Sequence, residues 1–528
     1  MKTNFSRVMA TMALRFRDNL AIVNVERDRR YSYAEYHRLT NRIAHMMRHA
    51  LGLGTGDKVL LILENDNLSL LHFPAIYKQE ATFVFSNLRD SPEEQARQID
   101  QVKPKLVFIE TRLVASYRDM LAGRGCTVVA MDRSSDLPPD VTCFWDLVEA
   151  ASDADNDVEL DVHEHTAILR FTGGTTALGK CAMYSIDHFM AMRDSFYLTT
   201  DLAYDEDTKY LAFTPMSHAS LMPFVATFFA GGTTYTLNTP DLTQWCETVQ
   251  RERITQSLMV PTLLYRLLDM NSSKTYDLSS LRTMIYGAAP IAPAAVERLV
   301  AEFGQIFVQL YGASETIMFV SILRKREHRS DTEAARARLA SAGRVSAGVE
   351  LMIADLDGRP LPTGQTGEIW LRTRATIGGY YHNPEATAAE FANGFWKSGD
   401  VGYVDDDGYL YLTDRATFMI ISGGVNIYPQ ESENLLITHP KVADAAVFGV
   451  PDEDLGEAVK AVVQPMPGVQ PGPELVEELI AFCGEHLSRQ KVPRSIDFEN
   501  ELPRLPTGKL YKGSLRDRYW KGHKSHIL

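Results

Sequence analysis

Residues 169–180 hold the combination of side chains in this chain that is best suited to chemistry. They read Leu-Arg-Phe-Thr-Gly-Gly-Thr-Thr-Ala-Leu-Gly-Lys and continue a short apolar run that predicts a strand. Glycine lets the backbone approach a bulky anion, exposed N–H and hydroxyl groups donate to phosphate oxygens, and lysine adds a positive charge. The segment therefore predicts a phosphate-binding loop, with an ordinary Gly/Thr surface loop as the alternative. Its candidate donors are Thr172, Gly173, Gly174, Thr175, Thr176 and Lys180.

Two kinds of phosphate loop fit this segment. The run from Gly174 to Lys180 matches the G-x-x-x-x-G-K core of a P-loop, but Cys181 follows where a Ser or Thr would hold Mg²⁺. A P-loop also opens a helix at its lysine, whereas residues 181–185 have the pattern of a strand. A P-loop-like nucleotide-binding protein without further chemistry therefore stays open as an alternative.

A second chemical set follows a predicted strand at residues 307–311. Gln309, Tyr311, Gly312, Ser314 and Glu315 lie at its carboxyl end, where open α/β sheets place ligand-binding residues. The aromatic ring suits a base, the hydroxyl suits phosphate, and the carboxylate suits Mg²⁺. Small residues end another predicted strand and would leave room for a flat ring, namely Gly287, Ala288 and Ala289.

Two further positions have both a functional and an ordinary interpretation. Asp400 follows a tight turn at Gly399, where a carboxylate can accept both hydroxyls of a ribose or simply complete the turn. Lys509 follows Gly508 on a predicted surface loop, where most lysines are only solvated. His218 after the strand at 210–213 is likewise either structural or part of a pocket.

The elements that must position these residues alternate between strand and helix patterns. Apolar runs at 58–63, 82–85 and 106–109 predict strands, Ser91 predicts a helix N-cap followed by Pro at the first helical position, and residues 66–77 predict one helix. This alternation predicts a layered α/β domain with parallel pairing. Residues 1–22 predict an amphipathic helix, and 321–344 predict an exposed helix or long loop. Short alternating strands then predict a β-rich subdomain, and a compact α+β domain of about 110 residues follows.

Five motifs in one order, spanning roughly residues 20 to 515, resemble those of the adenylate-forming superfamily of acyl-CoA synthetases, luciferases and adenylation domains. The family's loop usually ends in Gly-x-Pro-Lys-Gly, and Ala177, Gly179 and Cys181 stand at its first Gly, its Pro and its last Gly. The other four motifs are the runs Tyr-Gly-x-Ser-Glu at 311–315 and Ser-Gly-Asp-x-Gly at 398–402, Asp-Arg at 414–415, and Gly-Lys at 508–509.

The resemblance implies an α/β fold with a large N-terminal domain at 1–413, whose β-rich subdomain covers about 345–413. It implies a hinge at 414–417, containing Asp414 and Thr417, and a small mobile α+β C-terminal lid at 418–528. Thr417 stands where the family usually has Lys or Asp.

The resemblance also implies a role for each matching residue. Lys509 would bridge the acid's carboxylate and the α-phosphate of ATP, Glu315 would hold Mg²⁺, and Gly423 and Gly424 would line the passage of the CoA thiol. The implied catalytic set is Lys509, Thr172, Lys180 and His218. The implied ATP- and AMP-binding set is Thr172, Gly173, Gly174, Thr175, Thr176, Lys180, Gly287, Ala288, Ala289, Gln309, Tyr311, Gly312, Ser314, Asp400 and Arg415. The implied acyl pocket is His218, Met222, Tyr286, Ala288, Ala313 and Met318.

By this resemblance the chain looks like a free-standing acyl-CoA synthetase that uses ATP, Mg²⁺ and CoA as a co-substrate. The small and flexible apolar pocket residues suit a medium-chain, alicyclic or aromatic acid, and no charge among them selects a second carboxylate. A stand-alone adenylation enzyme that loads a carrier protein remains an alternative, as does a catalytically silent relative.

Composition narrows the remaining classes. Apolar content of 45% and charged content of 23% match an ordinary globular protein, and 528 residues predict more than one folding unit. A net charge of −14 argues against a general nucleic-acid binder. Five scattered cysteines without a C-x-x-C pair favour free thiols over disulfides or zinc. With no secretory signal and no long apolar run, we expect a cytoplasmic protein without a transmembrane segment, which could form a homodimer.

Overall fold

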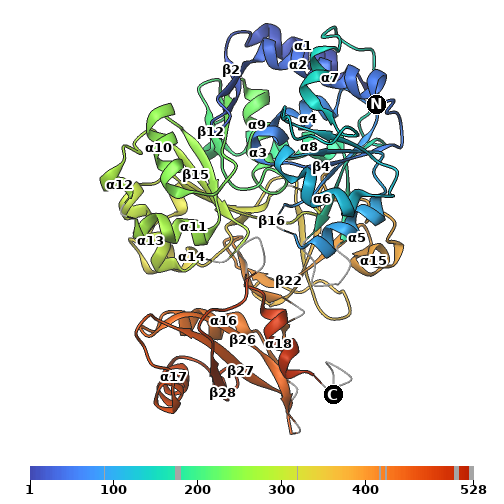
Figure 1. Cartoon of the computed structure of the whole chain (residues 1–528). Helices are drawn as coiled ribbons and strands as arrows, with labels where there is room; N and C mark the ends of the chain where they lie inside the picture. Colours follow the sequence, from blue (N-terminus) through green and yellow to red (C-terminus); the bar gives the residue numbers. More distant parts are fainter. Residues whose placement is uncertain are drawn as a thin grey trace. The chain divides into compact units, whose positions relative to one another are not determined.

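The chain divides into two compact units (Figure 1). The first holds residues 1–339, 345–350 and 372–396, and the second holds 340–344, 351–371 and 397–528. The computed structural model describes residues 1–88, 90–172, 180–270, 272–289, 291–317, 319–415, 418–422, 425–452, 454–504 and 510–521. The predicted hinge at 414–417 lies inside the second unit, and the boundaries that we predict around it stay a prediction.

One sheet of the first unit has seven strands, all parallel except for the pairing of β10 with β11. Their order is β11 (Lys180–Ser185), β10 (Thr166–Thr172), β5 (Thr82–Phe85), β4 (Lys58–Ile62), β6 (Leu106–Ile109), β7 (Thr127–Ala130) and β8 (Thr142–Cys143). All four residues of β6 are buried, as expected of a parallel strand covered on both faces. The predicted strands at 58–63, 82–85 and 106–109 are confirmed as β4, β5 and β6.

The larger sheet of this unit is parallel at its centre and antiparallel at its margins. Its order runs β17 (Phe319–Leu323), β16 (Phe307–Gly312), β15 (Thr283–Gly287), β14 (Gln256–Met259), β12 (Lys209–Ala212), β13 (Thr233–Thr236), β2 (Leu20–Asn24) and β3 (Arg29–Ser32). Parallel neighbours end at the same edge, so β15 and β16 deliver the predicted nucleotide-binding residues side by side.

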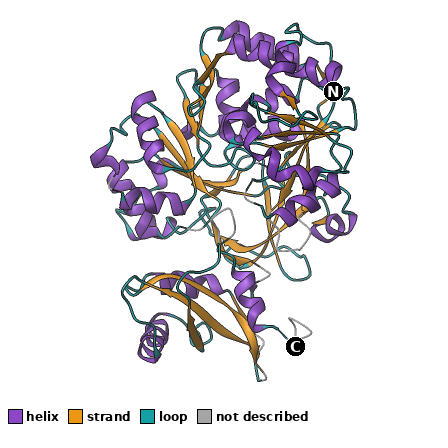
Figure 2. Ribbon diagram, viewed as in Figure 1, coloured by secondary structure: helices purple, strands orange, loops and turns teal. Residues whose placement is uncertain are grey.

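Helices cover these sheets (Figures 1 and 2). They are α1 (Phe5–Arg15), α2 (Tyr33–His45), α3 (Asn65–Leu70), α4 (Phe73–Ile76), α5 (Pro92–Val102), α6 (Val114–Leu121), α7 (Phe144–Glu149), α8 (Ile186–Leu198), α9 (Leu221–Ala230), α10 (Leu242–Glu252), α11 (Pro261–Asp269), α12 (Ser272–Thr275), α13 (Pro293–Phe303), α14 (Glu333–Arg338) and α15 (Pro384–Glu390). Side chains of α4, α8 and α9 pack in one core with both sheets, whereas α5 and α6 cover the other face of the seven-stranded sheet. This shared core joins the two sheets into one unit.

Local signals explain where helices begin and where three predictions are wrong. Ser91 caps α5 through the N–H of Glu94, as predicted. Residues 66–77 form two short helices rather than one, because Pro74 can sit only in the first turn of a helix.

The two other corrections concern long segments with mixed patterns. Within 1–22 only α1 is helical, and the segment from Leu20 instead pairs with neighbouring strands. Within 321–344, residues up to Leu323 belong to the buried strand β17, and His328, Leu339 and Ala342 are also buried, so the exposed part is mainly the stretch 329–338 around α14. In both cases the apolar residues pair in the sheet, which outweighs the charge pattern around them.

The second unit contains two sheets. Strands β19 (Glu350–Ala354), β20 (Gly367–Arg372), β22 (Phe395–Val404) and β23 (Leu410–Arg415) form the predicted β-rich part. The other sheet has β25 (Val425–Ile427), β24 (Ile420–Ser422), β27 (Gly456–Pro465), β26 (Val442–Asp452) and β28 (Ser495–Phe498), with helices α16 (Pro429–Ile437), α17 (Pro473–His486) and α18 (Lys512–Tyr519). Alternate residues of β26 and β27 face α16 and α17 on one side and α18 on the other.

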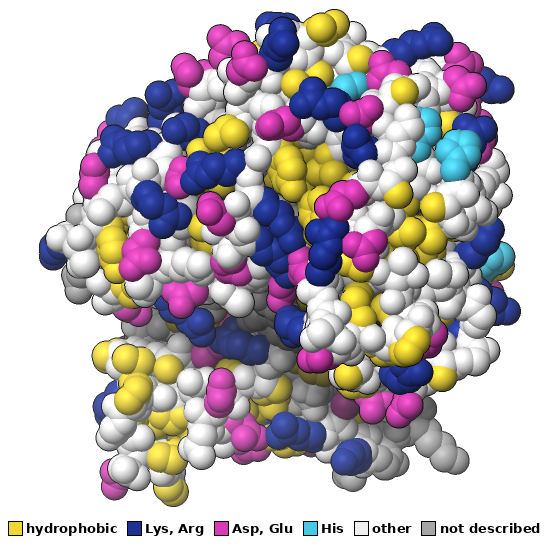
Figure 3. All heavy atoms as spheres, turned by 45° about the horizontal axis from the view of Figure 1, so that its top comes forward, with side chains coloured by type: hydrophobic (Ala, Val, Ile, Leu, Met, Phe, Trp, Pro, Cys, Tyr) yellow, Lys and Arg dark blue, Asp and Glu magenta, His cyan; other side chains and the backbone are white. Residues whose placement is uncertain are grey.

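All five cysteines are free, and four of them are buried. On the face shown in Figure 3, basic and acidic side chains are interspersed rather than gathered by sign. In the described part of the chain, no helix combines the length and the apolar character needed to cross a bilayer.

Candidate active site

The predicted phosphate loop joins two antiparallel strands. Thr172 ends β10 and pairs with Lys180, the first residue of β11, so the backbones on the two sides of residues 173–179 lie next to each other. Gly173, Gly174, Thr175 and Thr176 lie outside the described residues. Because a strand and not a helix begins at Lys180, the P-loop alternative is wrong: the next helix, α8, starts only at Ile186.

Lys180 is held by side chains of a segment more than 190 residues further along the chain. Its ammonium forms an ion pair with Glu390, at the end of α15, and lies 5.6 Å from the centre of the Tyr380 ring. The two charged side chains are 20% and 26% exposed, so water screens this pair only partly.

Glu315 follows β16, is buried, and joins the same group of residues. Its Oε1 lies within hydrogen-bond distance of the Tyr380 hydroxyl, at 3.0 Å, and its backbone oxygen accepts a hydrogen bond from the N–H of Ile377 at 2.8 Å. Next to it, the Tyr184 hydroxyl of β11 donates to the backbone oxygen of Ser314 at 2.9 Å. This hydrogen bond connects the segment that follows β16 in the larger sheet to β11 of the seven-stranded sheet.

The structure thus brings together two residues that we predict from the sequence, Lys180 and Glu315, through two that we do not, Tyr380 and Glu390. Burial beside the Glu315 carboxylate raises the pKa of Tyr380 well above its usual range, so its hydroxyl stays a donor. The signal that could have found Tyr380 is its place after two glycines, Gly378 and Gly379, just before an Asn-Pro helix start. Glu390 has no such signal.

The predicted adenine-binding residues lie at the ends of β15 and β16. Gly287 pairs with Leu310, and a Cβ on Gly287 would lie 2.1 Å from the Leu310 backbone oxygen. Ala288 has a left-handed backbone (φ 65°), which is uncommon for a residue with a side chain and costs energy. Tyr311 and Ala289 are half-buried, and Gly312 is exposed.

We expect Gly287→Ala to destabilise the protein by about 1–3 kcal/mol and to weaken ATP binding, because the methyl group must push β15 away from β16. Denaturant unfolding and the KM for ATP measure the two effects. The control is Gly54→Ala, where an added Cβ meets nothing within 4 Å. Equal stability of the two variants would contradict this close packing.

The candidate acyl-pocket residues lie in three different surroundings. Nδ1 of His218 is hydrogen-bonded to the Ser217 hydroxyl at 2.9 Å. Met222 on α9 packs against the main core. Tyr286 is 1% exposed, its hydroxyl lies 2.9 Å from Nε2 of His328, and burial raises its pKa. Ala313 is half-buried, and Met318 lies outside the described residues.

The predicted ribose residues belong to the second unit. Asp400 is paired directly with Arg415 across β22 and β23. This register puts the two backbone positions directly opposite each other on neighbouring strands. Gly399 has a left-handed backbone (φ 68°) but lies inside the strand β22, so the tight turn that we predict before Asp400 is wrong. For Asp414 and Arg415 the structure describes only the backbone, and Thr417, Gly423, Gly424 and Lys509 lie outside the described residues.

A buried ion pair anchors the chain just after Lys509. Lys512 at the start of α18 lies 2.7 Å from Oε1 of Glu433, and both are less than 10% exposed. The Lys512 ammonium also lies 4.9 Å from the ring of Phe418, which follows the predicted hinge. The residue that follows the predicted hinge, Phe418, therefore contacts a residue that follows Lys509, namely Lys512.

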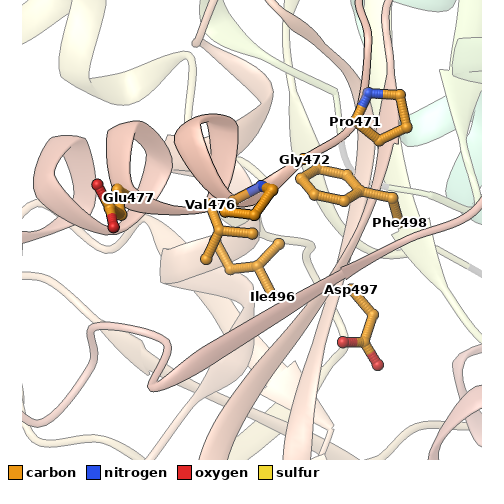
Figure 4. Close-up of a pocket in the computed structure, with 8 residues that line it drawn as sticks. Pro471, Gly472, Val476, Glu477, Ile496, Asp497 and Phe498 are labelled. Atoms are coloured by element: carbon orange, nitrogen blue, oxygen red, sulfur yellow. The ribbon is translucent and has the colours of Figure 1, made fainter.

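A broad, open groove of about 660 Å³ lies in the second unit (Figure 4). It is lined by Pro471, Gly472, Pro473, Val476, Glu477, Ile496, Asp497 and Phe498. None of the predicted site residues is among them, so this groove is distinct from the candidate active site.

Comparison with known proteins shows the family of this chain. The AMP-binding enzyme family matches residues 9–381, and the AMP-binding enzyme C-terminal domain matches 431–509. A feruloyl-CoA synthase from an Amycolatopsis species is 33% identical over 492 residues, 92% of this chain and 94% of that protein. A fatty acid–[acyl-carrier-protein] ligase, ScoC, from Streptomyces coeruleorubidus is 32% identical over 499 residues, 93% of this chain and 92% of that protein.

A solved structure shows the same fold over nearly the whole chain. The amide bond synthetase McbA from Marinactinospora thermotolerans superposes with a TM-score of 0.85 at 29% identity, covering 97% of this chain and 99% of that one. The fold and the site define an adenylate-forming enzyme. The chain belongs to the AMP-binding enzyme family and is an AMP-forming ligase of the acyl-CoA synthetase type.

Proposed function

We propose that this enzyme activates a medium-chain, alicyclic or aromatic carboxylic acid with ATP and transfers the acyl group to CoA. The products are acyl-CoA, AMP and pyrophosphate. The observation that supports this best is the linkage of Lys180 and Glu315 through Tyr380, which puts a phosphate-binding cation next to a carboxylate suited to a metal.

The first step forms the acyl-adenylate. The acid's carboxylate attacks the α-phosphorus of ATP, and pyrophosphate leaves. Lys180 with the hydroxyls of Thr172, Thr175 and Thr176 would hold the phosphates, and Lys509 would bridge the carboxylate and the charge that develops on the α-phosphate. Such a reaction depends mainly on positioning and neutralisation of charge.

The residues around Glu315 fit Mg²⁺. Magnesium is usually bound through one or two carboxylates together with substrate phosphates, not by a cage of protein ligands. Glu315 offers one buried carboxylate at the site, and the described residues contain no group of three His, Cys, Asp or Glu side chains that could hold a metal without the substrate. Mg²⁺ held there would neutralise phosphate charge.

In the second step the lid would rotate about Asp414 to Thr417, withdrawing Lys509 and bringing Gly423 and Gly424 to the passage of the thiol. The thiol sulfur attacks the acyl carbon, and AMP leaves. Tyr311 and residues 287–289 would pack the adenine, and Asp400 with Arg415 would bind the ribose. A rotation of this kind is a hinge motion.

The substrate class is supported by residue type and by relatives. Met222, Ala288 and Ala313 are small or flexible apolar groups, and His218 is the one titratable side chain besides Tyr286 among the candidate pocket residues. Such a set offers no cation for a second carboxylate on the acid. A feruloyl-CoA synthase among the relatives favours an aromatic acid, and a fatty-acid ligase favours an aliphatic one.

The test of this function is a panel of carboxylic acids with ATP and Mg²⁺, assayed with CoA, with an acyl carrier protein, and with neither. We expect AMP and a thioester with particular acids when CoA is present. A thioester formed only on the carrier protein would mean that the acceptor is a carrier protein and not CoA. An amide formed when an amine is added would point to the chemistry named for McbA.

The cytoplasm as compartment and a homodimer as assembly also belong to this proposal. Free cysteines fit a reducing compartment. Light scattering during size-exclusion chromatography tests the assembly, where a mass of one chain would exclude the dimer.

A further inference from the structure

Glu390 is an acidic residue directly beside the lysine to which we assign phosphate binding. It ends α15, and its two carboxylate oxygens have different partners: one is paired with Lys180, and the other lies 2.5 Å from the Tyr380 hydroxyl. A negative charge at this place opposes the binding of a triphosphate, so its presence needs a reason.

The Tyr380 hydroxyl lies between two carboxylates. Its oxygen is 2.5 Å from Glu390 and 3.0 Å from Glu315, but a phenol has one hydrogen and donates to one of them at a time. The shorter distance favours Glu390. Whatever changes the charge of Glu390 therefore also changes how strongly Tyr380 binds Glu315, the candidate metal carboxylate.

The backbone fixes this arrangement. Ala182 and Tyr380 form an antiparallel bridge, and the Tyr381 N–H donates to the Cys181 oxygen at 2.7 Å, so the segment with Tyr380 lies along β11 next to Lys180. The Asn383 side chain caps α15 by accepting from the N–H of Ala386, which sets the direction of the short helix that ends at Glu390.

We infer that Glu390 is a positioning residue, which holds Lys180 and Tyr380 in the state without nucleotide and so sets the balance between ATP binding at Lys180 and Mg²⁺ binding at Glu315. This inference rests on the proposed function. ATP must compete with Glu390 for the Lys180 charge. Because Glu390 accepts the hydrogen bond of the Tyr380 hydroxyl, the Glu315 carboxylate remains available to bind the metal.

Two opposite effects of Glu390→Gln follow. Without the carboxylate, Lys180 loses this ion pair and ATP no longer competes with Glu390 for its charge, so ATP binds more tightly in the absence of metal, by about 3- to 5-fold, as loss of a partly exposed ion pair implies. The Tyr380 hydroxyl then donates to Glu315 and competes with the metal for this carboxylate. The Mg²⁺ concentration for half-maximal ATP–pyrophosphate exchange therefore rises by a similar factor. General damage to the site would weaken both ATP binding and Mg²⁺ binding. Tighter ATP binding together with weaker Mg²⁺ binding therefore identifies Glu390 as a positioning residue.

The experiment measures ATP binding by isothermal titration calorimetry in EDTA, and the Mg²⁺ dependence of ATP–pyrophosphate exchange with a saturating acid. The matched control is Glu385→Gln, because Glu385 is an exposed acid on the same helix. Both of its values are expected to equal those of the wild type. In a Lys180→Met background, Glu390→Gln is expected to have no further effect on ATP binding, because the residue acts through that lysine.

The Tyr380→Phe variant separates the effect of Glu390 on Lys180 from its effect on Tyr380. It keeps the ion pair but removes the shared hydrogen, so ATP binding in EDTA stays at the wild-type value and the Mg²⁺ requirement does not rise. If the wild type binds ATP and the Glu390→Gln variant binds it equally or more weakly, the inference is overturned and the proposed function stands. Wild-type protein that binds no ATP overturns the proposed function and this inference together.

Discussion

Lys509→Ala is expected to abolish adenylate formation while leaving thioester formation from supplied acyl-adenylate nearly intact. Removal of one group that stabilises developing charge lowers a rate by about 10²–10³-fold. In the mechanism that we propose, the second step uses the lid in its other orientation with Lys509 withdrawn, so we expect its loss to have little effect there.

The structure gives this prediction a physical basis in the second unit. Lys512 and Glu433 form a buried pair three residues after Lys509, and Lys512 also contacts Phe418 just after the predicted hinge. We therefore expect a rotation at the predicted hinge to move the segment that bears Lys509 as well.

The measurement is a pair of assays on one variant: acid-dependent pyrophosphate release, and CoA-dependent consumption of chemically prepared acyl-adenylate. Lys521→Ala, at an exposed lysine of the same unit, is the control and should leave both rates unchanged. Equal loss of both half-reactions in Lys509→Ala would contradict the alternation of the lid.

Glu315→Ala is expected to weaken Mg²⁺-dependent adenylation strongly. Loss of even an outer-shell partner of a metal lowers affinity by roughly 10- to 100-fold, and a direct ligand should reach at least this range. Glu315→Gln keeps an acceptor for the Tyr380 hydroxyl but removes the charge, so it separates metal binding from support of the site.

The measurement is the Mg²⁺ concentration for half-maximal pyrophosphate release, with Glu333→Gln on the exposed start of α14 as the control. Both Glu315 variants should require more Mg²⁺ than the control. A requirement unchanged in Glu315→Gln would remove Glu315 from the metal site.

Local patterns were enough to predict several parts of the fold and of the candidate site. The strand that begins at Lys180, the capped start of α5 at Ser91 and the position of Glu315 shortly after β16 all depend on residues close in sequence. Pairing between distant segments was not accessible in this way. The helical interpretation of residues 1–22 is confirmed for Phe5–Arg15 but wrong from Leu20, because Leu20–Asn24 pairs with strands, and one of these, β13, lies about 210 residues away.

The Tyr380–Glu390 contacts show the same limit at the site. Glu390 is a surface-type residue at the end of a seven-residue helix, and nothing in its neighbourhood marks it. It reaches Lys180 only because the segment at 377–381 bonds to Glu315 on one side and to Cys181 on the other. Partners of this kind follow from tertiary contacts, which motif spacing does not encode.

The most direct test of the central claim is ATP–pyrophosphate exchange in the absence of CoA, measured with and without the acid that the panel selects. Exchange that depends on both the acid and Mg²⁺ is the result we predict, because reversible formation of an acyl-adenylate is the only step that returns pyrophosphate to ATP. Release of inorganic phosphate without exchange would contradict it and would mean that the site hydrolyses ATP instead of activating an acid.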